Sequence, residues 1–128
     1  MKKLITWINI TSIALIVLGL IHLIAVIKIA PMYQNLSQGQ FSVFMFLYLA
    51  TGLGTVLPGL ISKLQIKALI DKSKNAWITV FICSIYTMII GAGAIIQMTK
   101  NPFAYIAFII SISLLIPTLL IKKQLKND

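Results

Sequence analysis

The sequence predicts an all-α integral membrane protein, an antiparallel four-helix bundle with its N and C termini in the cytoplasm. Three observations support this fold class: an extreme apolar composition, four long apolar runs, and an uneven distribution of lysines between those runs. Of the 128 residues, 59% are hydrophobic and only 10% are charged. Soluble domains average about 45–50% apolar and about 25% charged residues, and small domains bury only about two-thirds of their chain surface. We therefore expect lipid to surround most of this chain.

Each of the four apolar runs is long enough to cross a bilayer, because about 20 apolar residues span the roughly 30 Å of hydrocarbon. The runs cover about residues 4–27, 41–61, 76–98 and 102–121, so the whole chain, 1–128, is expected to form a single membrane domain. The first run follows two lysines, as a signal peptide would. It is longer than the usual apolar segment of about 7–15 residues, so we expect it to remain as the first span.

The segments between the runs have the composition of connections. Residues 31–40 are polar with turn-forming residues at both ends, which predicts a loop. Residues 62–75 contain four lysines and one aspartate and cannot lie in lipid. Residues 99–102 predict a short turn that ends at Pro102, where a helix begins and the missing proline N–H has no cost.

The lysines set the orientation, because cytoplasmic segments close to membrane spans collect positive charge. The N-terminal tail, the second connection and the C-terminal tail would share one side of the membrane and contain nine lysines: Lys2, Lys3, Lys63, Lys67, Lys72, Lys74, Lys122, Lys123 and Lys126. The other side contains only Lys28 and Lys100. We therefore predict a multi-pass protein of the bacterial inner membrane, with anionic lipids as partners at the cytoplasmic face. Trp7 and Trp77 are both expected at this interface.

Small residues recur along one face of each run, which is typical of helix–helix contacts in lipid. We expect the second helix to pack through its repeat of threonine and glycine, and the third through a stripe that includes Ser84 and Thr87. The principal predicted packing residues are Gly19, Gly52, Thr55, Gly59, Gly91 and Ala94.

His22 is the main candidate for a functional side chain, since ionisable residues inside a span are functional candidates by default. Two interpretations remain open. One is a structural hydrogen bond to a neighbouring helix, with Tyr48 or Gln97 at a comparable depth as the partner. The other is a ligand or proton site formed by the same three residues.

The absent residue types exclude several functions. The acidic residues are Asp71 and Asp128, there is no glutamate or arginine, and the chain has one histidine and one cysteine. We therefore expect no catalytic activity, no cofactor, no metal site and no membrane-embedded carboxylate of the kind that drives small antiporters. Without arginine, nucleic acid is not an expected partner. Cys83 is expected to be a small apolar side chain within the third span.

Two short segments resemble the DoxX-like family of small bacterial four-helix membrane proteins. They are Gly19-Leu-Ile-His22, with Pro31 soon after it, and Thr51-Gly-Leu-Gly-Thr-Val-Leu-Pro58. The resemblance covers about the first half of the chain and implies a redox or quinone-linked role. The family often has an acidic residue in its second helix, where this chain reads Phe46-Leu-Tyr-Leu-Ala50.

The function that these observations favour is binding, as an accessory subunit or as a holder of a lipophilic ligand, of another membrane protein or of a second copy. A transporter or channel component is the alternative, with a vestibule formed by His22, Gln97, Lys100, Gln38 and Gln40. Immunity against a membrane-active toxin is a third hypothesis.

Overall fold

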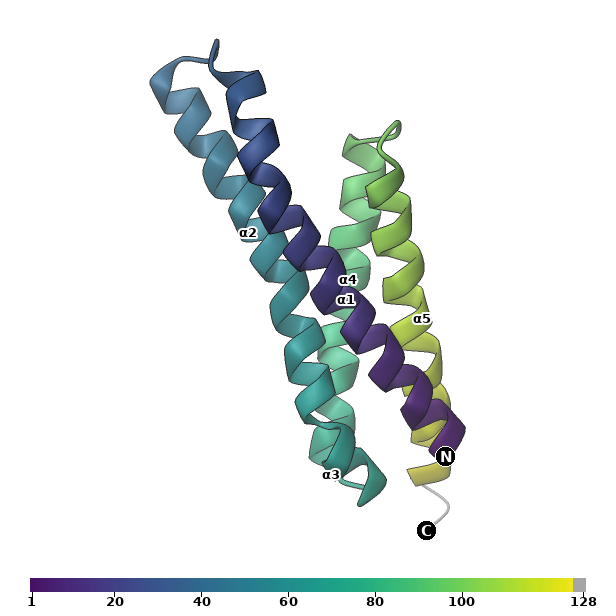
Figure 1. Ribbon diagram of the computed structural model, residues 1–128. Helices are drawn as coiled ribbons and strands as arrows, with labels where there is room; N and C mark the ends of the chain where they lie inside the picture. The colour runs from purple at the N-terminus through teal and green to yellow at the C-terminus, as the bar shows by residue number, and fades with distance from the viewer. Residues whose placement is uncertain (126–128) are drawn as a thin grey trace.

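The computed structural model describes residues 1–125, so Lys126 and Asp128, which were counted above, lie outside the described residues. The described part is almost entirely helical (Figure 1). Its elements are α1 (Lys2–Ile29), the 3-10 helix η1 (Ala30–Tyr33), α2 (Gln38–Leu64), α3 (Ile66–Ile70), α4 (Lys74–Gln97) and α5 (Pro102–Leu125). This confirms the predicted all-α class.

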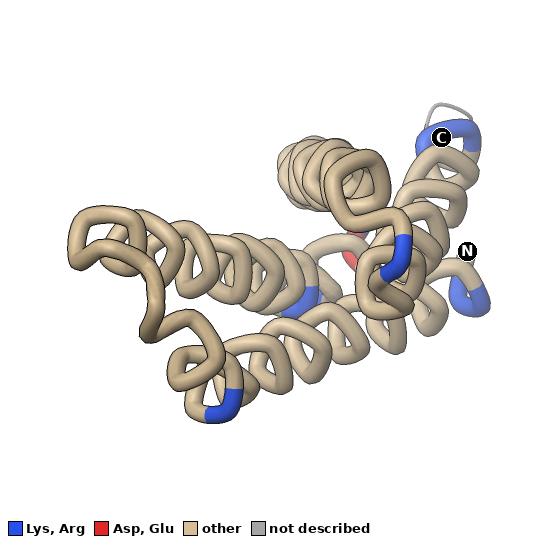
Figure 2. The backbone as a smooth tube through the Cα atoms, turned by 90° about the horizontal axis from the view of Figure 1, so that it is seen from above, with Lys and Arg blue, Asp and Glu red and all other residues tan. Residues whose placement is uncertain are grey.

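The four long helices form two antiparallel hairpins, α1–α2 and α4–α5. Contacts of α1 with α5 and of α2 with α4 join the hairpins into a bundle. The N-terminus, α3 and the end of α5 lie together, and we call this the terminal end of the bundle. At the opposite end, here the turn end, the α1–α2 hairpin diverges from the α4–α5 hairpin (Figures 1 and 2).

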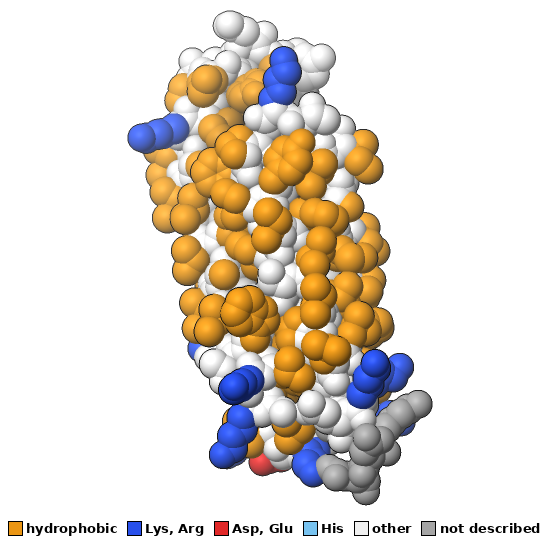
Figure 3. Space-filling model, turned by 90° about the vertical axis from the view of Figure 1, so that its right-hand side faces the viewer, with side chains coloured by type: hydrophobic (Ala, Val, Ile, Leu, Met, Phe, Trp, Pro, Cys, Tyr) orange, Lys and Arg blue, Asp and Glu red, His pale blue; other side chains and the backbone are white. Residues whose placement is uncertain are grey.

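Four segments are long and apolar enough to cross a membrane, as the sequence predicts: Lys2–Tyr33, Gln38–Leu64, Lys74–Gln97 and Pro102–Gln124. Only between 17% and 33% of the most apolar stretch of each segment is buried inside the molecule. The surface is correspondingly covered by hydrophobic side chains, with the lysines gathered toward the two ends (Figure 3). The bundle therefore presents an apolar surface on its outside.

The first connection is shorter than the predicted loop over residues 31–40. Its first residues continue α1 as the helix η1, and α2 already begins at Gln38. The reason is a capping box: Ser37 Oγ accepts a hydrogen bond from the Gln40 backbone N–H, while Gln40 Oε1 accepts one from the Ser37 N–H. Gln38 and Gln40 thus belong to the first turn of a helix.

The second connection, predicted over residues 62–75 as a charged segment that cannot lie in lipid, is largely helical. It contains the end of α2 and the short helix α3, whose Leu69 is fully buried. Lys72, the residue after the Asp71 C-cap of α3, adopts a left-handed φ of 58°. Its N–H donates to the Leu69 carbonyl, and the Ser73 N–H donates to the Ala68 carbonyl, which is the Schellman pattern that ends a helix.

The hydrophobic core lies toward the terminal end of the bundle. It is formed by Ile5, Ile8, Leu15, Leu69, Ala76, Trp77, Val80, Leu114 and Ile121. Trp77 differs from the expectation of an interfacial side chain, because it is 8% exposed and its Nε1–H donates to the Thr118 carbonyl at 2.7 Å. Cys83 is buried and free, in agreement with its expected role as a small apolar side chain.

Trp7 compensates for a break in the hydrogen bonds of α5. Pro117 lies inside that helix and has no N–H, so the Ser113 carbonyl, four residues earlier, lacks its usual helical donor. The Trp7 Nε1–H from α1 donates to this carbonyl at 3.0 Å. The indole is 52% exposed, as an interfacial tryptophan would be, and it also fastens α1 to α5.

Glycines bring α1 and α2 into close contact. A Cβ added to Gly19 would lie 2.9 Å from the Gly52 carbonyl oxygen, and one added to Gly59 would lie 2.8 Å from the Ser12 carbonyl oxygen. Both distances are shorter than a van der Waals contact, so only glycine allows the two backbones to approach this far. Thr51, expected on the same contact face, is instead exposed.

Candidate functional site

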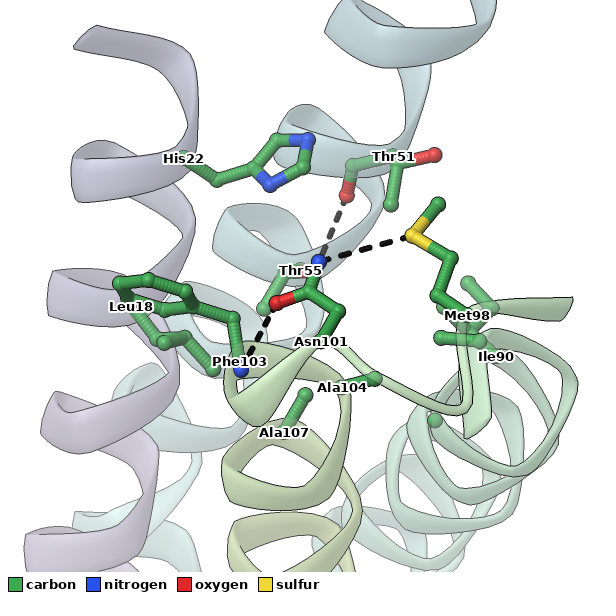
Figure 4. Close-up of a pocket in the computed structure, with 12 residues that line it drawn as sticks. Leu18, His22, Thr51, Thr55, Ile90, Met98, Asn101, Phe103, Ala104 and Ala107 are labelled. Atoms are coloured by element: carbon green, nitrogen blue, oxygen red, sulfur yellow. Dashed lines mark hydrogen bonds between the residues drawn. The ribbon is translucent and has the colours of Figure 1, made fainter. Parts of the chain in front are cut away.

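A cavity of about 70 Å³ lies toward the turn end of the bundle, where the two hairpins diverge. All four long helices and the α4–α5 turn contribute to its wall. We call it the turn-end cavity, and its lining residues are Leu18, His22, Thr51, Thr55, Ile90, Gly91, Ala94, Met98, Asn101, Phe103, Ala104 and Ala107 (Figure 4). The lining is mainly apolar and contains no charged side chain.

The cavity exists because small residues hold each hairpin together and leave little to fill the space between hairpins. A Cβ added to Gly91 would lie 3.0 Å from Phe108 Cα, so α4 and α5 are in close contact at this level. Ala94 on α4 and Ala107 on α5 face the cavity with a single methyl group each. Both alanines belong to the α4–α5 hairpin, and the α1–α2 hairpin diverges from it at this level, so these methyl groups leave the space between the hairpins open.

His22 is held at the cavity wall by two contacts with Tyr48 of α2. Its Nε2 lies 3.2 Å from the Tyr48 carbonyl oxygen, and its ring stacks on the tyrosine ring with centroids 4.0 Å apart and planes 16° apart. The Tyr48 ring in turn contacts Phe44, whose ring packs on Tyr33. An aromatic row along the α1–α2 hairpin therefore fixes the plane of the imidazole.

Gly52 allows His22 to reach this carbonyl. A Cβ at residue 52 would lie 2.5 Å from Leu23 Cδ2 and 3.3 Å from His22 Cδ2. A larger residue would force the Leu23 side chain to move and would press on the edge of the imidazole. The packing residue Gly52 is thus also a positioning residue for His22.

Asn101 supplies a second polar group to the cavity. Its Oδ1 accepts a hydrogen bond from the Phe103 N–H at 3.0 Å, so it caps the start of α5. Its Nδ2 donates to Met98 Sδ at 3.6 Å, and sulfur is a weak acceptor. The amide projects into the cavity from the α4–α5 turn (Figure 4).

The two threonines of the lining have hydroxyls that already bond to their own helix. Thr51 Oγ1 donates to the Leu47 carbonyl at 2.8 Å, and Thr55 Oγ1 donates to the Thr51 carbonyl at 2.9 Å. Their donor protons are therefore occupied. The polar capacity that remains for a ligand lies mainly on His22 and Asn101.

The structure places the three residues of the predicted ligand or proton site as follows. His22 and Tyr48 are in contact, although Tyr48 uses its backbone carbonyl and ring face for this contact. Gln97 is exposed near the end of α4 and does not line the cavity. Asn101 was not among the predicted site residues, although an asparagine just before Pro102 is a recognisable helix cap.

Some of the predicted packing residues lie where α1 and α2 are in contact, here called the α1–α2 seam, and the others line the cavity. Gly19, Gly52 and Gly59 lie at the α1–α2 seam, while Gly91, Ala94 and Thr55 line the cavity. The polar residues proposed for a vestibule do not gather with His22. Gln38, Gln40 and Lys100 are exposed, and none of them lines the cavity.

Residues 1–125 contain no group of three or more histidine, cysteine, aspartate or glutamate side chains that could hold a metal ion. No protein-family model, curated protein or solved structure matches the chain. The resemblance to the DoxX-like family accordingly stays a prediction.

Proposed function

We propose that this chain is a multi-pass membrane protein that binds a lipophilic molecule in the turn-end cavity. The observation that carries the proposal is the cavity itself: an apolar, uncharged space between two hairpins, with one imidazole and one amide in its wall. Binding sites for small molecules have this character, mostly apolar with a few placed polar groups. The imidazole and the amide favour a binding function over catalysis, because the lining has no carboxylic acid, no thiol and no hydroxyl with a free donor hydrogen.

The proposal places the terminal end in the cytoplasm and the cavity toward the opposite face of the membrane. Of the nine lysines on the proposed cytoplasmic side, the eight among the described residues are exposed. Lys28 and Lys100 lie toward the turn end, at the last turn of α1 and in the α4–α5 turn. This asymmetry supports both termini inside, in the cytoplasmic membrane of a bacterium.

Native mass spectrometry of the protein, extracted gently from its own membrane, tests the binding function. We expect wild type to carry a bound small molecule that the His22→Ala variant loses. Gln97→Ala is the matched control, since Gln97 is polar and on a neighbouring helix but outside the cavity.

A second variant tests whether the ligand needs the volume of the cavity, with the imidazole left unchanged. Ala94→Leu adds three carbon atoms to the cavity wall and is expected to exclude the molecule while His22 stays in place. If no preparation carries a bound molecule, or if both variants retain it as wild type does, the binding proposal is wrong.

A further inference from the structure

We infer that the polar end of the bound molecule is a neutral hydroxyl group, an alcohol or a phenol, which donates its hydrogen to Nδ1 of His22. This inference rests on the proposed binding function and adds the chemical class of the ligand. It follows from the hydrogen bond that His22 makes inside the protein, from the lack of charge around the cavity and from the second polar group in its wall.

The Tyr48 carbonyl determines which nitrogen of His22 carries the hydrogen. A carbonyl oxygen can only accept, so the Nε2 that lies 3.2 Å from it must be the donor. In a neutral imidazole the other nitrogen, Nδ1, then has a lone pair and can only accept. A half-turn of the ring would put a carbon in place of Nε2 and lose the hydrogen bond to the Tyr48 carbonyl, so this bond also favours the ring orientation described here.

The remaining nitrogen faces the cavity. In Figure 4 the imidazole lies on the α1 side of the cavity, with one ring nitrogen directed toward the space that Asn101 also enters. Within residues 1–125, no group donates a hydrogen bond to Nδ1. An acceptor at the wall of an apolar cavity gains a hydrogen bond from a ligand that brings an O–H, so such a ligand is favoured over an otherwise equal ligand that does not.

The lining selects a neutral ligand. None of its side chains is a carboxylate or an ammonium group, and Lys28 and Lys100 are both outside it. A carboxylate or a quaternary ammonium ligand would therefore meet no counter-charge in this apolar lining, which is unfavourable. A hydroxyl group has no such cost.

Asn101 can form a hydrogen bond with the same ligand hydroxyl group. Its Nδ2 donates to the sulfur of Met98, a weak acceptor that a ligand oxygen can replace. A hydroxyl oxygen can accept this hydrogen bond while its hydrogen is donated to His22. An ether or a ketone could accept from Asn101 but would leave Nδ1 unpaired.

The size of the cavity limits what it encloses. A volume of about 70 Å³ holds a hydroxyl and a few carbon atoms. The rest of a lipophilic molecule would extend between the diverging hairpins, along apolar side chains such as Leu18, Ile90 and Phe103. The inferred ligand is accordingly a long-chain alcohol or a phenol with an apolar tail.

The chain has one histidine, which permits a direct test by nitrogen-15 NMR of histidine-labelled protein in lipid nanodiscs. We expect Nε2 to be protonated and Nδ1 to be unprotonated. Saturable addition of 1-dodecanol is expected to shift the Nδ1 signal, whereas dodecyl methyl ether, which has the same tail but no donor, leaves it unchanged. A protonated Nδ1, or equal shifts with both compounds, would overturn the inference.

Competition measured by native mass spectrometry gives an independent readout. We expect wild type and Gln97→Ala to prefer the alcohol over the ether by about tenfold, the factor that one hydrogen bond typically supplies. The preference should disappear in His22→Ala. If alcohol and ether occupy the cavity equally, and Ala94→Leu excludes both, the hydroxyl inference fails while the binding function stands. If neither compound binds and no native molecule is found, both fail.

Discussion

Gly59 provides the strongest test of how the two hairpins are built. In a Gly59→Ala variant, the new Cβ would lie 2.8 Å from the Ser12 carbonyl oxygen and 3.0 Å from both Leu15 Cβ and Ile16 Cγ1. The oxygen belongs to the α1 backbone and cannot rotate away, so α1 and α2 would have to separate until the contact reaches at least 3.4 Å. Gly93→Ala on α4 is the matched control, because a Cβ there meets nothing within 4 Å.

The two substitutions make the same chemical change, so their difference isolates the helix–helix contact. Replacing glycine by alanine within a helix gains about 1 kcal/mol of intrinsic helix stability. Overpacking a tight contact costs about 1–3 kcal/mol. We therefore expect Gly93→Ala to stabilise the protein slightly, and Gly59→Ala to be less stable than Gly93→Ala by about 1–3 kcal/mol.

The free energy of unfolding can be measured by reversible denaturation of the protein in mixed micelles with increasing SDS. Each variant would be compared with wild type under the same lipid and detergent conditions. If Gly59→Ala is as stable as Gly93→Ala, the α1 and α2 backbones are not in contact at this glycine and the described seam is wrong.

Three further predictions concern the site, the bundle and the orientation. Gly52→Ala is expected to lower ligand occupancy in native mass spectrometry, because the added Cβ moves Leu23 and presses on the His22 ring; unchanged occupancy would contradict the positioning role. Trp7→Phe should destabilise the protein by about 1 kcal/mol, the usual contribution of one hydrogen bond. That loss should shrink in a Pro117→Ala background, where the backbone regains the donor for the Ser113 carbonyl; an equal loss in both backgrounds would count against the compensation. A reporter fused to the C-terminus is expected to be active in the cytoplasm, and external activity would reverse the orientation.

The number and approximate position of the long helices could be predicted because each is set by a simple quantity, the length of an apolar run. The residues at which the helices begin and end could not be predicted in the same way, because they depend on capping hydrogen bonds. The first connection reads as polar, yet Ser37 and Gln40 form a capping box that starts α2 early. The second connection is rich in lysine, so its composition did not predict a buried residue there. Leu69 is nevertheless fully buried and packs α3 against the bundle. Polar composition predicted where the apolar runs are interrupted, but it did not reveal the helical turns within these connections.

The site was predicted in part. His22 and Tyr48 were identified from depth along their helices, which a sequence provides. Gln97 has a comparable depth, but it does not line the cavity. The glycines at positions 19 and 52 bring α1 against α2, so His22 meets Tyr48. Depth can be counted from one sequence, whereas the choice of neighbouring helix depends on which small residues meet in three dimensions.

The distribution of side-chain size explains why a binding site would form at the turn end. At the terminal end, Trp77, Leu114 and Ile121 fill the space between helices, and the two tryptophan indoles bond to carbonyls of α5. At the turn end, half of the twelve residues that line the cavity are alanine, glycine or threonine. The hairpins are therefore held together at one end and separated at the other. A molecule that enters between them would fill an existing gap without disturbing the core, so its binding would not compete with the packing that stabilises the fold.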